Sequence, residues 1–154
     1  MRVQAPVMNA EERKGEGPKR KRPDICKRSF QYALRAIKLY RFLPKTKDGA
    51  AWVLGKQFLK AATSVGANIQ EAQSGETKAD FIHKYGIAQK EARECSYWLE
   101  LIGEAGIVPR SRLLPLMKET EELFAVITAI ILKAKGGVKE IERDGQAACN
   151  SEPA

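Results

Sequence analysis

The sequence predicts an all-α protein with the architecture of an antiparallel up-down four-helix bundle. Apolar residues recur at spacings of three and four along four segments of roughly 20 to 28 residues. The segments are joined by short stretches of Pro, Gly or helix-capping residues, so helices adjacent in the chain can pack side by side. No alternating β-branched run flanked by turn residues, the pattern of a strand, occurs in the 154 residues.

The first two helices have start and stop signals. Asp24 is a suitable N-cap for a helix that ends at about Leu43, because a proline follows there. Asp48 is a suitable N-cap for a second helix, which ends at about Gln73 before the polar sequence SGE at 74–76. The small residues of this second helix, including Gly66, would let a neighbouring helix approach closely.

The third and fourth helices also have start and stop signals. Thr77 and Asp80 resemble a capping box with Asp in place of Glu, at the start of a helix that runs to about Ala105. Ser111 is a suitable N-cap for a fourth helix to about Lys135, where two glycines follow. The apolar seams of these helices predict the core positions Phe81, Tyr85, Ala88, Ala92, Cys95, Leu99, Ile102, Leu116, Leu123, Ile127, Ile130 and Ala134.

The predicted bundle spans residues 24–135, and the segments before and after it are expected to lack a packed core. Residues 1–23 contain Gly, Pro and charge without apolar periodicity, which predicts a disordered basic arm. Residues 136–154 predict a flexible polar tail. The arm has a net charge of +4, the bundle +6 and the tail −2, so the excess of positive charge belongs to the folded part as well.

The composition is that of a cytoplasmic protein. The three cysteines are far apart and without CxxC spacing, which argues against a zinc site or disulfides and for a reducing compartment. No apolar run approaches the roughly 18 residues of a membrane span. The N-terminus lacks the apolar stretch of a signal peptide. We therefore expect no membrane partner.

Polar residues gather on one side of the second helix. Ser64, Asn68 and Glu71 fall within about 80° of one another, and Glu91 of the third helix is a candidate partner. One interpretation is a structural set of interhelical hydrogen bonds, in which Asn68 and Glu71 reach helix three near Glu91 or Arg93. Replacing Asn68 by Ala would then cost roughly 1 to 3 kcal/mol. The other interpretation is a functional site.

No catalytic, metal or cofactor site is predicted. Catalysis would need a partner of perturbed pKa in a pocket, and the sequence offers none. His83, the only histidine, lies opposite the helix-three seam, which favours a surface position. Glu91 and Glu94 lack the Glu-x-x-His motifs of metal-binding bundles. Trp52 and Trp98 can stack on bases, but core or interface packing is the favoured interpretation.

Residues 62–102, ATSVGANIQEAQSGETKADFIHKYGIAQKEARECSYWLELI, resemble the bacterial four helix bundle protein family. This family includes proteins encoded in intervening sequences of large-subunit ribosomal RNA genes, and the accessory variability determinant of diversity-generating retroelements. The resemblance covers about residues 24–135. The shared positions are Ser64, Ala67, Asn68, Ile69, Glu71, Phe81, Ile87, Ala88 and Glu91.

The resemblance implies a bundle that assembles into a homopentameric ring with basic surfaces and has no catalytic activity. In the retroelement branch it implies an adaptor that binds a reverse transcriptase and its template RNA. Two hypotheses follow for this chain. The first is a non-catalytic adaptor for RNA or RNA/DNA; the alternative is a structural or protein-interaction bundle that binds no nucleic acid.

Helix one carries the candidate nucleic-acid surface. Its basic residues fall within an arc of about 140°. Such a column of cations can neutralise phosphates and release counterions. The alternative is an ordinary solvated face, but the chain has no acid between Asp24 and Asp48 to mix the signs. The candidate binding residues are Lys27, Arg28, Arg35, Lys38, Arg41 and Lys45.

Two further features of the N-terminal half bear on partners. Leu34 and Phe42 interrupt the basic arc, and we expect them to contact a neighbouring subunit. Phe30 falls on the opposite, core-facing arc. The sequence PKRKRP at 18–23 is a second, less specific candidate for phosphate contacts.

Overall fold

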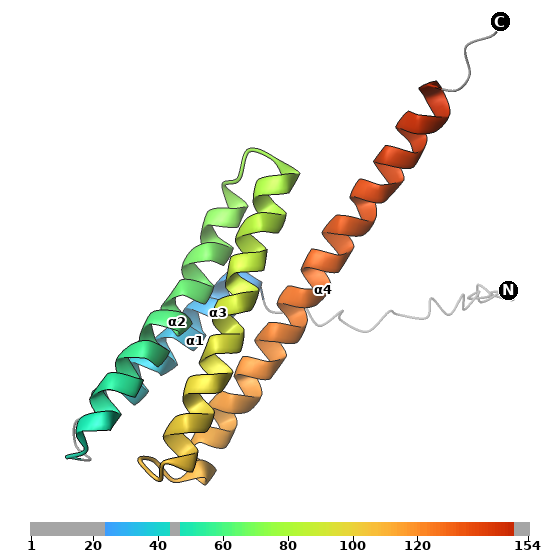
Figure 1. The fold of residues 1–154 in the computed structure, drawn as a ribbon. Coiled ribbons are helices and arrows are strands. Elements are labelled where there is room, and N and C mark those ends of the chain that lie inside the picture. The colour runs from blue at the N-terminus through green and yellow to red at the C-terminus, as the bar shows by residue number, and fades with distance from the viewer. Residues whose placement is uncertain (1–23, 44–46, 150–154) are drawn as a thin grey trace, which may run out of the picture.

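The computed structural model describes residues 24–43 and 47–149 (Figure 1). The predicted basic arm at 1–23, the PKRKRP sequence within it and Lys45 lie outside the described residues. In the part that is described, the chain forms four α-helices and no strand. The helices are α1, Ile25–Phe42; α2, Gly49–Gln73; α3, Lys78–Glu104; and α4, Arg110–Cys149. The all-α, four-helix bundle prediction is therefore confirmed.

The predicted N-caps of the first three helices are present. The Asp24 carboxylate accepts a hydrogen bond from the Cys26 backbone N–H at 3.0 Å, and that of Asp48 accepts one from Ala50 at 2.8 Å. Thr77 Oγ1 accepts a hydrogen bond from the Asp80 backbone N–H and donates one to the Asp80 carboxylate. Each cap satisfies an N–H group that has no partner within its helix.

The prediction for the end of the fourth helix is wrong. The helix α4 begins at Arg110, one residue before Ser111, and continues past Lys135 to Cys149. It extends beyond the ends of the other three helices (Figure 1). A glycine costs only about 1 kcal/mol relative to alanine inside a helix, and the residues that follow the two glycines are mostly good helix formers. The backbone at 136–149 is thus helical, while residues 150–154 lie outside the description.

The core runs between the helices as the apolar seams predict. On α3, the buried positions are Tyr85, Ala88, Ala92, Cys95, Leu99 and Ile102, and Phe81 is half-buried against them. On α4, the predicted positions Leu116, Leu123 and Ile127 are buried, as is Ile131, while the predicted Ile130 and Ala134 are half-buried. The core of α2 includes Phe58, Ala62, Val65 and Ile69.

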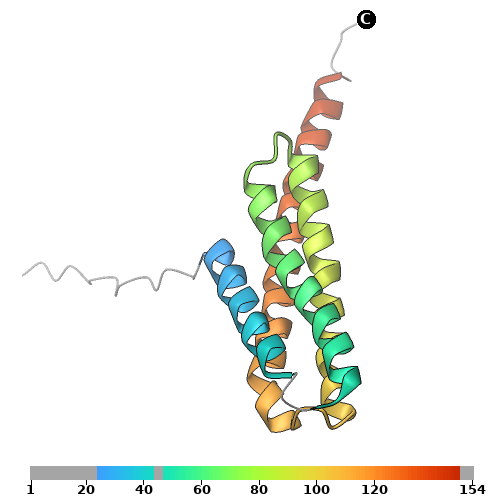
Figure 2. The same cartoon turned by 90° about the vertical axis from the view of Figure 1, so that its left-hand side faces the viewer.

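The helices differ in how much surface they share. The pair α2 and α3 packs most extensively, α1 lies against α2, and α4 lies against α3 (Figures 1 and 2). The helices α1 and α4 approach each other at few positions. Each of these two helices is therefore packed mainly against one neighbour, α1 against α2 and α4 against α3.

The close approach of α1 and α2 depends on Gly55 rather than on Gly66. A Cβ atom at Gly55 would lie 2.3 Å from Leu43 Cδ1 and 3.3 Å from Tyr40 Cδ2. At Gly66 it would lie 3.6 Å from the Ser29 carbonyl oxygen, an ordinary van der Waals distance. The second helix is therefore thin where α1 ends, and Gly66 has room for a methyl group.

Candidate nucleic-acid interface

Three of the predicted binding residues form a stripe on the exposed side of α1. Lys27, Lys38 and Arg41 lie within about 60° of one another around the helix axis, and all three are exposed. No carboxylate lies within ion-pair distance of any of them among residues 24–43 and 47–136, whose side chains the structure describes. We call these three residues the α1 stripe. Its charges are available to a polyanion.

Two other predicted residues have carboxylate partners from another helix. Arg28 forms an ion pair with Glu122, and Arg35 forms one with Glu119, both acids belonging to α4. Acids of another helix therefore oppose two of the six predicted cations. The sequence of α1 lacks acids, but the fold supplies them from α4, more than 80 residues away in the chain.

A buried hydrogen bond holds α1 against α4 beneath these ion pairs. Tyr32 Oη lies 2.6 Å from Thr120 Oγ1, and the Thr120 hydroxyl donates to the Leu116 carbonyl oxygen at 2.8 Å. Burial raises the pKa of Tyr32 well above its usual range. Burial also raises the pKa of the neighbouring Cys95 thiol to about 12. Both groups are therefore protonated at neutral pH.

The predicted polar cluster on α2 is only partly interhelical. Asn68 Nδ2 donates to the Ser64 carbonyl oxygen of its own helix at 2.9 Å, so the expectation that Asn68 reaches α3 is wrong. An amide at position i lies directly above the carbonyl at i−4, which makes this bond easy to form. Glu71 does reach α3, but its partner is Lys84 rather than Glu91 or Arg93.

Glu91 lies apart from these contacts and is half-buried on α3. Desolvation raises the pKa of its carboxyl, and the nearby charge of Glu94 raises it further, while Lys60 of α2 lowers it. No hydrogen bond from the Glu91 side chain is present in the described residues. The four residues Ser64, Asn68, Glu71 and Glu91 therefore do not form one connected network.

The apolar side of α1 is more exposed than the sequence predicts. Phe30, expected in the core-facing arc, is 62% exposed, whereas Leu34, which is 38% exposed, lies at the surface as expected. Phe42, expected to contact another subunit, packs instead against the core, with the Arg112 guanidinium 5.6 Å from its ring centroid. Because α1 meets mainly α2, its apolar arc is wider than the surface that buries it.

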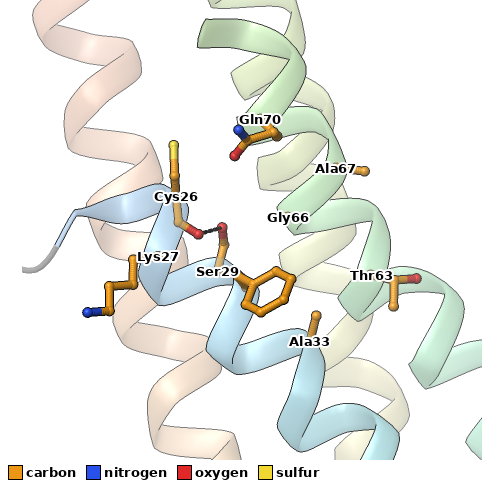
Figure 3. A pocket seen from close by; sticks show the side chains of 9 residues that line it. Cys26, Lys27, Ser29, Ala33, Thr63, Gly66, Ala67 and Gln70 are labelled. Carbon is orange, nitrogen blue, oxygen red and sulfur yellow. Dashed lines mark hydrogen bonds between the residues drawn. The ribbon is translucent and has the colours of Figure 1, made fainter.

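A mostly apolar hollow of about 550 Å³ lies between α1 and α2 next to Phe30. Cys26, Ser29 and Ala33 line it from α1, and Thr63, Gly66, Ala67 and Gln70 line it from α2 (Figure 3). Lys27 stands at its edge and points away from α2 (Figure 3). The α1 stripe thus borders an exposed apolar surface.

The two tryptophans and the single histidine, which were considered as possible site residues, differ in their exposure. Trp52 is 51% exposed, whereas Trp98 is half-buried and its buried indole N–H has no hydrogen-bond partner among the residues described. His83 is exposed, as expected. No group of three His, Cys, Asp or Glu residues is placed to hold a metal ion in the described part of the chain. None of the described helices is long and apolar enough to cross a membrane.

Comparison with known proteins identifies relatives of the bundle. A family model described as 23S rRNA-intervening sequence protein matches residues 21–129. A crystal structure described as a protein with unknown function from the S23 ribosomal protein family, from Bacteroides thetaiotaomicron, is 36% identical with a TM-score of 0.65. That alignment covers 70% of this chain and 98% of the other. No curated protein matches the chain.

Proposed function

Because the chain belongs to the 23S rRNA-intervening sequence protein family, we propose that it is a non-catalytic, self-associating protein that binds RNA through the α1 stripe. The observation that carries this proposal is the exposure of Lys27, Lys38 and Arg41 without carboxylate partners in the described residues. Cations in this state gain most from phosphate contacts, because they have no ion pair to break and release counterions from the nucleic acid.

The stripe supports binding to phosphates rather than reading of bases. Lysine and arginine contacts to phosphates position a nucleic acid but carry little sequence information. The net charge of +8 adds long-range attraction for any polyanion. We therefore expect affinity that falls steeply with salt and discriminates little between RNA sequences.

The test replaces the stripe and compares it with an equal loss of charge elsewhere. The triple variant Lys27→Gln, Lys38→Gln, Arg41→Gln should bind a labelled RNA hairpin more weakly by fluorescence anisotropy. Its plot of log K against log salt should flatten by about two to three per subunit engaged. The matched control is Lys78→Gln, Lys90→Gln, Lys133→Gln, which changes three exposed lysines on α3 and α4. If both triples weaken binding equally, overall charge rather than the stripe is responsible.

Self-association is supported by the apolar surface beside the stripe. Phe30 and Leu34 are neighbours on one side of α1, and the hollow between α1 and α2 adjoins Phe30. Burying these residues against a second copy would remove apolar area from water. We infer a homopentamer as the assembled state, as the family resemblance implies. Light scattering should give a mass well above the 17.1 kDa of one chain, and Phe30→Ser should lower it.

The proposal includes an antiparallel order of the helices. Contacts between chain-adjacent helices support it. Gly66 of α2 lies beside Ser29, and Gly55 lies beside Leu43, so the later residue of α1 meets the earlier residue of α2. On α3 and α4, Gln89 bonds to Thr128 and Glu100 bonds to Arg110, again in opposite order.

A second candidate is a structural or protein-interaction bundle without nucleic acid. The exposed apolar residues of α1 favour it, because they need no RNA to be covered. A role beside a reverse transcriptase stays a prediction from the resemblance. If the wild-type protein assembles but binds no RNA at low salt, this second candidate takes precedence.

A further inference from the structure

A tryptophan and two lysines form a separate exposed surface in the first half of α2. Trp52 is in the first turn of the helix, and about half of its surface is exposed. The Lys56 ammonium, one turn later, lies over one face of the Trp52 ring, 5.4 Å from its centroid, so a base would stack on the other face. Together with Val53, Gln57 and Lys60, these residues line a hollow of about 470 Å³.

The charge around Trp52 is positive. Residues 49–70 contain no Asp or Glu, and neither Lys56 nor Lys60 has a carboxylate within ion-pair distance among the residues described. The nearest acid in sequence, Asp48, uses its carboxylate to cap the Ala50 N–H. Lys60 also acts electrostatically on Glu91 of α3, so Lys56 is the less compensated of the two lysines.

An exposed indole beside lysines matches one class of ligand well. Unpaired nucleobases stack on aromatic rings, and the phosphates on either side of a stacked base need positive charge. In a duplex the base faces are already covered by their neighbours, so only a single strand can use such a ring. Tryptophan is enriched at the centres of protein–protein interfaces but lysine is depleted there, so it is the two lysines beside the ring that favour a nucleic acid over a protein partner.

We propose that Trp52 is a stacking platform for an unpaired base of single-stranded RNA, with Lys56 and Lys60 contacting the adjacent phosphates. This site rests on the proposed RNA-binding function but is distinct from the α1 stripe in residues and in chemistry. The stripe binds any phosphate backbone, whereas the Trp52 platform gives a preference for unpaired segments.

The test uses a variant in which Trp52 is the only tryptophan. Trp98→Phe removes the other indole together with its N–H, which has no hydrogen-bond partner in the described part of the chain. In this background a short single-stranded oligoadenylate should quench Trp52 fluorescence, and an RNA duplex of the same length should quench it far less. Trp52→Ala should weaken binding of the single strand by roughly 5- to 150-fold, leave duplex binding unchanged, and be largely restored by Trp52→Phe.

The control is Tyr97→Ala, which removes another aromatic side chain that is 58% exposed, on α3. It should leave single-strand binding within about twofold of wild type, well below the loss expected from one stacked base. If the duplex binds but Trp52→Ala has no effect on the single strand, the stacking platform is wrong while RNA binding by the stripe stands. If Trp52→Ala instead lowers the assembled mass, Trp52 is an interface residue and the platform is also wrong. If neither RNA binds, both proposals fail.

Discussion

Tyr32 of α1 and Thr120 of α4 share a buried hydrogen bond of 2.6 Å at one of the few places where these two helices meet. Since the Thr120 hydroxyl already donates to the Leu116 carbonyl oxygen, it accepts from Tyr32. The tyrosine therefore depends on the threonine for its acceptor, but the threonine does not depend on the tyrosine for its own donor. Removing the threonine hydroxyl should therefore cost more stability than removing the tyrosine hydroxyl.

Thr120→Val should destabilise the protein more than Tyr32→Phe. The valine leaves the buried Tyr32 hydroxyl without its acceptor, which should cost roughly 1–3 kcal/mol. The phenylalanine leaves Thr120 bonded to Leu116, and its cost should be about 1 kcal/mol or less. Urea unfolding followed by circular dichroism measures both values. Equal losses would mean that the hydroxyl of Tyr32 finds another acceptor.

Gly55→Ala and Gly66→Ala should change stability in opposite directions. Both glycines lie inside α2, where alanine is favoured by about 1 kcal/mol. At Gly66 the new methyl group meets only ordinary contacts, so Gly66→Ala should raise the free energy of unfolding. At Gly55 it collides with the fully buried Leu43 side chain, and repacking typically costs about 1–3 kcal/mol. The order of the two urea midpoints checks this; a reversed order would contradict the close approach at Gly55.

Glu91 should lower stability as its carboxyl ionises. Burial and the charge of Glu94 raise its pKa in the folded protein above the ordinary value of 4.5. Between 4.5 and the raised value, the folded state binds more protons than the unfolded state, so stability falls as pH rises through this window. Glu91→Gln should therefore be more stable than wild type at pH 7, and the gain should shrink towards pH 4. Thermal unfolding at both pH values tests it, with Glu76→Gln, at an exposed acid that does not act on Glu91, as the comparison.

Local signals in the sequence were sufficient to predict where most helices begin and which side of α3 is buried. They were not sufficient to predict how much of each helix is covered by the others. The caps at Asp24, Asp48 and Thr77 and the apolar seam of α3 depend on residues within a few positions of each other. The exposure of Phe30 depends on how much of α1 is covered by other helices, which periodicity does not report. The extension of α4 past Gly136 shows that two glycines are too weak a signal to end a helix.

The candidate site was predictable in part for the same reason. The sequence places Lys27, Lys38 and Arg41 on one face of a helix, and the structure leaves that face exposed. The partners of Arg28 and Arg35 come from α4 and arise only when the chain folds. An absence of acids within one helix therefore says little about the acids that face it.

Freeing these two arginines should strengthen RNA binding. In the double variant Glu119→Gln, Glu122→Gln, Arg35 and Arg28 lose their carboxylate partners and become available to phosphates next to the α1 stripe. Each arginine that joins the contact should steepen the plot of log K against log salt by about 0.7–0.9. Ion pairs at the surface contribute only about 0–1 kcal/mol each, and both of these are partly exposed, so the fold should survive. The matched control, Glu76→Gln with Glu94→Gln, removes the same charge from two exposed acids that have no ion pair in the described structure.

Anisotropy titrations of all three proteins against one RNA hairpin show whether the RNA lies along α1. A larger gain for the α4 variant places the RNA along α1, whereas equal gains would attribute the effect to net charge and remove α1 as the binding surface.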